Sequence, residues 1–208
     1  MDEPKKRAPR RRKVVPQEFE QAEIHLAKEN TGDVLAHQVT IQAGNARDIA
    51  ADLVTLTQGS ANTVNAKTLI ANQSAVARAD VNTLEAKQSA VGRVEAEELT
   101  ITQGAIGVAQ AENLVLESGG AVAVMGTNIG IEVGGAQYIL ARESVAVQQG
   151  GALVIAAPRV EIENGGAVFL FAREVHGNVR VLFDRQAALV FGVAVGVVLG
   201  LLVWAKRK

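Results

Sequence analysis

ELTITQGAIGVAQAE, residues 98–112, is the stretch that decides the fold. Its small and aliphatic residues advance by two positions, then three, then two. A step of two is a β-strand that turns alternate side chains to one face, and a step of three is a corner that shifts the phase. An amphipathic helix would need apolar residues at i, i+3, i+4 and i+7. The residues predicted to point inward are Leu99, Ile101, Gly104, Ile106, Ala109 and Ala111.

The pattern recurs every 15 residues, as a series of glutamines at 58, 73, 88 and 103 illustrates, with a one-residue insertion near Glu143. The nine turns from 38 to 173 have six inward positions each, and all 54 are Ala, Gly, Ser, Val, Ile or Leu. The sequence therefore predicts an all-β fold, a triangular single-stranded β-helix (β-solenoid) of about ten 15-residue turns over residues 23–178. Strands about 4.8 Å apart make this a rod on the order of 50 Å long.

Composition and charge fit a narrow rod with unlike ends. Hydrophobic residues make up 48% of the chain but aromatic ones only 3%, so the core is built from small side chains. The chain has no cysteine, which excludes disulfides and thiolate chemistry. Residues 1–22 carry seven basic and four acidic side chains, whereas residues 23–185 carry eleven basic and eighteen acidic ones. A basic tail thus precedes an acidic body.

The C-terminal residues predict a membrane anchor. After a juxtamembrane linker at 179–186, residues 187–205 read AALVFGVAVGVVLGLLVWA without a charge, and a basic stop follows at 206–208. A helix of this length spans about 28 Å, which matches a bilayer core. Small residues every four positions along one stripe favour self-association of such helices. The stripe consists of Ala188, Gly192, Gly196 and Gly200.

The topology expected from this arrangement is a single-pass, tail-anchored membrane protein with its solenoid in the cytoplasm. The N-terminal residues contain no apolar stretch of the kind that a signal peptide needs. The predicted membrane segment is therefore the last part of the chain to be made.

The N-terminal tail, residues 1–22, is expected to be disordered because it is charged and unpatterned. Anionic lipid is the leading partner for its basic cluster, at about 1 kcal/mol per basic residue near a membrane surface. Nucleic acid, the acidic flank of a neighbouring rod, or solvent alone are the alternatives. The cluster consists of Lys5, Lys6, Arg7, Arg10, Arg11, Arg12 and Lys13.

An apolar patch is predicted on the outside of the turns nearest the anchor. Around the corner between the second and third sides, outward positions of four successive turns contain apolar residues, whereas equivalent positions of earlier turns are polar or charged. Such a patch exceeds what a soluble monomer normally exposes, so a contact with protein, the bilayer or the anchor is expected. The predicted patch consists of Val122, Met125, Tyr138, Leu140, Leu153, Val154, Val168, Phe169 and Phe171.

The residues that could act in catalysis form no recognisable active-site motif. The sequence therefore predicts no enzyme, no cofactor and no metal site. His25 and His176 are isolated in the sequence. His37 and Asp52 occupy equivalent corner positions one turn apart, where we expect a surface hydrogen bond.

The run QSAVGRVEAEELTITQGAIGVAQAENLVLESGGAVAVMG, residues 88–126, resembles the bactofilins, a family of polymer-forming cytoskeletal proteins of bacteria. The resemblance covers roughly residues 38–173. It implies a triangular β-helix that polymerises end to end without nucleotide and has a disordered N-terminal tail that binds membrane.

Two functions follow as hypotheses. The first is a membrane-anchored, self-assembling scaffold whose partners are other copies of itself and the lipid bilayer, with other cytoskeletal or envelope proteins as further candidates. The alternative is an adaptor rod that recruits a partner protein through the apolar patch. An enzyme is the least favoured class.

Overall fold

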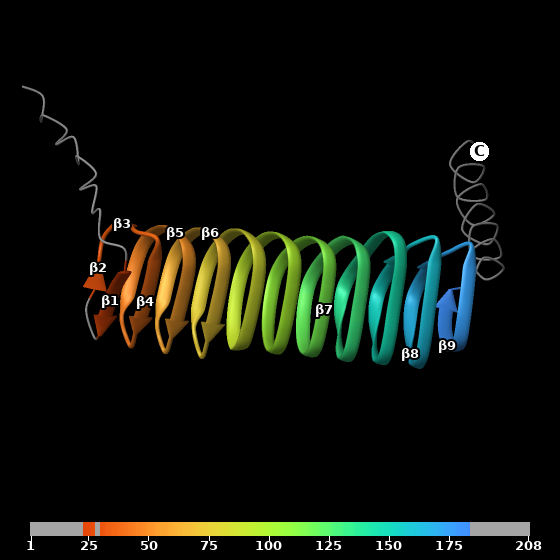
Figure 1. The fold of residues 1–208 in the computed structure, drawn as a ribbon. Coiled ribbons are helices and arrows are strands. Elements are labelled where there is room, and N and C mark those ends of the chain that lie inside the picture. Colours follow the sequence, from red (N-terminus) through yellow and green to blue (C-terminus); the bar gives the residue numbers. More distant parts are fainter. Residues whose placement is uncertain (1–22, 28–29, 184–208) are drawn as a thin grey trace, which may run out of the picture.

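The computed structural model describes residues 23–27 and 30–183, which form a rod of stacked coils (Figure 1). All strand pairs are parallel and belong to one sheet in the order β1-β4-β5-β6-β7-β8-β9, with β2 and β3 paired to β5. The predicted parallel β-solenoid of about ten turns is confirmed. The strands are β1 Glu23–Ala27, β2 Asn30–Thr31, β3 Val34–Leu35, β4 Gln38–Gln42, β5 Asn45–Thr57, β6 Ser60–Asn72, β7 Ala75–Ala156, β8 Arg159–Phe171 and β9 Glu174–Phe183.

Each turn has three sides. In the first turn the sides are separate strands, because β1 pairs with β4 while β2 and β3 pair with two parts of β5. In later turns the pairing continues around corners, so that β7 runs unbroken for 82 residues through several turns. Short sides joined by corners agree with the steps of two and three in the sequence.

The 15-residue period appears directly in the strand register. Gln38 pairs with Leu53, and Ser144 pairs with Arg159. The one longer step lies where it was predicted, since the Ser144 hydroxyl donates a hydrogen bond of 2.8 Å to Asn128, 16 residues earlier. The extra residue therefore lies between these two positions, as expected near Glu143.

The interior is a set of apolar columns along the rod axis. None of the 54 predicted inward positions is exposed. One column contains Val54, Leu69 and Leu84, each 0% exposed and each one turn beyond the last. Full burial of such a side chain contributes about 1.5–3 kcal/mol, so the stacked columns stabilise the coil.

The last turn differs from the sequence-based expectation. A strict 15-residue period would place Arg180 at an inward position, and the solenoid was therefore predicted to end at residue 178. Instead, a register shift between Ile162 and Gly165 shortens the step by one residue. Val179 then pairs with Gly165, and the sheet continues to Phe183, which pairs with Phe169.

The backbone at the corner between the first and second sides adopts two different conformations. In the earlier turns a residue with a side chain adopts a left-handed conformation, with φ between 49° and 55° at Ala43, Gln58, Gln73 and Gln88. In later turns glycines one position further along have positive φ, 143° at Gly119 and 129° at Gly134. A Cβ at Gly134 would overlap the carbonyl oxygen of Gly119, so only glycine fits there.

Candidate interaction surface

The outer side chains between the second and third sides form the apolar patch, defined as above. Among residues 23–27 and 31–177, whose side chains the structure describes, ten large hydrophobic side chains are exposed, and six of them belong to the patch. Phe171 is the most exposed of these, at 64%. Met125, Val154 and Val168 are half-buried instead. The six exposed members are Val122, Tyr138, Leu140, Leu153, Phe169 and Phe171.

The patch is restricted to the later turns. On one strand position the residues are Met125, Leu140, Ala156 and Phe171, and in the earlier turns the same position contains Asn65, Asp80 and Glu95. The neighbouring position contains Tyr138, Val154 and Phe169 in the later turns, but Thr63, Arg78 and Arg93 before them. Because the interior is the same along the rod, the change of the outer residues is not required by the fold.

A row of arginines lies at the next corner, beside the patch. Arg142, Arg159 and Arg173 are exposed there, and we call them the arginine row. Glu143 and Glu174 lie at the same corner, so this stretch carries three positive and two negative charges. The same corner in earlier turns contains Glu97, Glu98 and Glu112. The row was not predicted from the sequence, because Arg159 lies one corner position beyond the position that Arg142 and Arg173 share.

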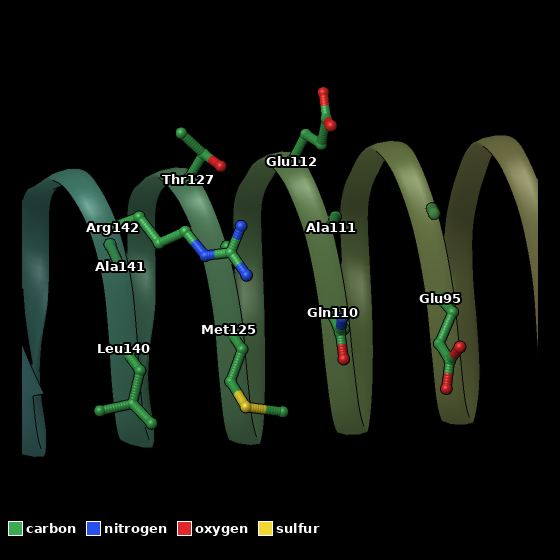
Figure 2. A pocket seen from close by; sticks show the side chains of 11 residues that line it. Glu95, Gln110, Ala111, Glu112, Met125, Thr127, Leu140, Ala141 and Arg142 are labelled. Atoms are coloured by element: carbon green, nitrogen blue, oxygen red, sulfur yellow. The ribbon is translucent and has the colours of Figure 1, made fainter.

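A groove of about 530 Å³ runs between the patch and this corner. Its base is made of small residues from successive turns, among them Ala111, Gly126 and Ala141. Figure 2 shows Met125 and Leu140 along one wall, while Arg142 extends toward the turn that carries Met125 and Thr127. The groove therefore lies between Met125 and Leu140 of the apolar patch and Arg142 of the arginine row, and Glu95 and Glu112 line it as well.

A glutamine ladder follows the opposite corner of the second side in the earlier turns. Gln58 donates to Gln73 at 3.1 Å, Gln73 to Gln88 at 2.9 Å, and Gln88 to Gln103 at 3.2 Å. The sequence shows the period of these glutamines, and the structure adds the hydrogen bonds between them. Small residues such as Ser60, Ala75 and Ala90 lie next to the ladder and line shallow depressions.

The predicted contact between His37 and Asp52 is confirmed. Their Nδ1 and Oδ2 atoms are 2.8 Å apart, and Lys67 Nζ lies 2.8 Å from the other oxygen of Asp52. Hydrogen bonds from Lys67 and then from His37 lower the pKa of Asp52 below its ordinary value of 3.8. All three side chains are exposed, so this is a chain of polar contacts on the surface. Within residues 23–27 and 30–183, no cluster of three or more His, Asp or Glu side chains is arranged to hold a metal ion.

Two predicted sites lie outside the described residues. One is the basic cluster Lys5–Lys13, and the other is the segment 187–205 with Ala188, Gly192, Gly196 and Gly200. In the part of the chain that the structure describes, no helix is long and apolar enough to cross a membrane. Both sites remain predictions.

Comparison with known proteins does not assign this chain to the bactofilins, so the similarity to them stays a resemblance in sequence pattern. No protein-family model, curated protein or solved structure matches this chain.

Proposed function

We propose that this chain is a membrane-anchored, self-assembling scaffold of the bactofilin-like type, whose rods stack end to end without nucleotide. The β-solenoid fold is compatible with a polymer-forming scaffold. The anchor is the uncharged segment 187–205, and the solenoid lies on the cytoplasmic side. Protease protection of the solenoid in sealed vesicles tests that orientation.

The observation that supports stacking is the open end of an apolar column. Val175 occupies an inward position and pairs with Val160. Val160 is 0% exposed, whereas Val175 is 44% exposed because no described strand follows on its outer side. Another rod stacked on this end would cover Val175 and continue the column.

Strand edges at both ends favour the same association. Among the described strands, β1 and β9 are the two ends of the sheet order and pair on one side only. Unpaired edges of parallel strands are templates for pairing with another chain. At the β1 end, Ile24 and Leu26 are half-buried against the core, so apolar contact would accompany the pairing.

The experiment introduces a charge at the open column. We expect residues 1–185, which contain every described strand, to sediment as large assemblies. Val175→Glu is expected to reduce these assemblies to single or paired rods, because a carboxylate would be buried at the contact. The control Glu174→Lys changes a charge on the same strand at an exposed position and is expected to assemble. Assembly of Val175→Glu at the level of the parent protein would exclude stacking through this end.

The alternative function, an adaptor rod, is favoured by the exposed apolar patch. An adaptor would stay a single rod until its partner is added, whereas a scaffold assembles alone. If the patch holds copies of the protein together, Phe169→Glu combined with Phe171→Glu would shrink the assemblies. If light scattering shows that the assemblies of this double variant keep their size, the patch does not contribute to self-assembly.

A further inference from the structure

The outer face of the later turns combines three features: exposed apolar side chains, neighbouring arginines and the exit of the chain. We propose that the apolar patch and the arginine row lie on an anionic lipid bilayer, so that the four turns that carry the patch form a second membrane contact. This inference rests on the proposed membrane anchor for its geometry, but the patch is tested separately from the anchor below.

The patch has the composition of an interfacial surface. From Val122 onward, Gln137 is the one polar residue at the outward positions around this corner, and the others are apolar or aromatic. Aromatic rings with one polar edge, such as that of Tyr138, favour the boundary between headgroups and acyl chains. Insertion of Phe171 and Leu140 would remove apolar surface from water, at about 25 cal/mol per Å².

The arginine row supplies the electrostatic part. Arginine stems cover apolar surface while their charged heads reach phosphates. With Glu143 and Glu174 included, the corner beside the patch has a net charge of +1, and three glutamates give −3 at the corresponding corner of the preceding turns. The net charge of the corner thus changes from negative to positive where the outer face changes from polar to apolar. Both changes fit contact with an anionic surface and limit that contact to the later turns.

The path of the chain places this end of the rod near the bilayer. Phe183 pairs with Phe169 of the patch, and the predicted membrane segment begins at residue 187. Four residues reach at most about 14 Å when fully extended. An anchor that enters the bilayer at residue 187 therefore holds the patch close to the headgroups.

The earlier turns set the orientation of the rod. On the same face they carry Arg78, Asp80, Arg93 and Glu95, which favour water. A rod that inserts the four patch-bearing turns would therefore lie on the bilayer with its C-terminal part and keep its earlier turns in solvent.

The experiment uses single-cysteine variants of the full chain, which has no cysteine of its own. Gln137→Cys labels the patch, and Asn62→Cys labels the equivalent position in an earlier turn. Both replace an exposed carboxamide side chain, so the pair is matched, and neither removes an apolar member of the patch. Val195→Cys labels the predicted anchor. Each variant carries an environment-sensitive fluorophore and is reconstituted into phosphatidylcholine vesicles with phosphatidylglycerol, with or without a quencher attached to the lipid acyl chains.

We expect the label at position 137 to be quenched several-fold more than the label at position 62. We also expect this quenching to fall when phosphatidylglycerol is omitted, or when Arg142, Arg159 and Arg173 are replaced by Gln. Equal quenching at 137 and 62 would overturn the lipid contact. A blue shift at 137 that grows with protein concentration but resists the lipid quencher would also overturn it, and would assign the patch to a second copy.

The label at position 195 separates this inference from the proposed anchor. Quenching at 195 without excess quenching at 137 would leave the anchor standing and remove the second contact. Quenching at 137 without quenching at 195 would support the patch and overturn the anchor. Absence of quenching at both positions would overturn both.

Discussion

The turns before residue 118 and those after it share one interior but differ in their exteriors. Leu99 in the first group and Ile139 in the second are both almost completely buried. The outer face between the second and third sides is mainly polar or charged in the first group and mainly apolar in the second. The corner between the first and second sides also changes, from left-handed residues bearing side chains to glycines. The interior residues thus follow the fold, whereas the outer residues vary with position along the rod, and we propose that contacts form where they become apolar.

The largest expected effect tests whether the interior is packed equally well in the turns before and after residue 118. Leu99→Ala and Ile139→Ala should each cost about 2–5 kcal/mol of unfolding free energy, because each leaves a cavity in a packed column. Urea unfolding followed by circular dichroism measures both. A cost below about 1 kcal/mol for only one of them would mean that the two groups of turns are not packed alike.

The next effect concerns the corner of the later turns. Gly134→Ala should cost about 1–3 kcal/mol, since its φ of 129° disfavours a side chain and its Cβ would overlap the Gly119 carbonyl oxygen. Gly120→Ala is the control, because its Cβ would meet only the Gly135 oxygen at 3.8 Å. Equal losses for the two variants in thermal unfolding would contradict the glycine requirement.

A smaller effect is expected at the glutamine ladder of the earlier turns. Gln73→Ala removes the hydrogen bonds to Gln58 and Gln88 and should cost about 1 kcal/mol. Gln73→Gly removes the same bonds but relaxes a residue with φ of 49°, so it should cost less than Gln73→Ala. If glycine is the worse replacement in urea unfolding, left-handed strain is not significant at this corner.

The smallest effect is the pH dependence of the contacts that Asp52 makes. Because the pKa of Asp52 is lowered in the folded state, its contribution is fully present above the ordinary value of 3.8. It is lost as pH falls through the lower folded value. Asp52→Asn should therefore lower the urea midpoint slightly near neutral pH, and the difference should vanish in strong acid. A constant difference across this range would mean that the carboxylate charge is not responsible.

The repetitive part of the fold was predictable because every turn repeats one rule. Small inward residues at steps of two and three indicated which side chains face the core, and the 16-residue step near Glu143 was visible in the same pattern. The end of the solenoid was misplaced because the shift between Ile162 and Gly165 removes one residue from the period. No local sequence signal marks that shift, and the pairing of Phe183 with Phe169 became evident only from the register.

The candidate surface was predictable in position but not in detail. Outward placement followed from the period, which correctly gave Tyr138, Leu140 and Phe171 as exposed. The half-burial of Met125 and Val154 depends on packing between neighbouring turns, which the period does not describe. The arginine row was missed because its members alternate between two adjacent corner positions, Arg142 and Arg173 on one and Arg159 on the other.

The central claim, self-assembly without nucleotide, is tested most directly by electron microscopy of residues 1–185 in negative stain at physiological salt. We expect filaments many times longer than a single rod. Single rods of about 50 Å, the length of ten stacked turns, would contradict self-assembly and favour the adaptor.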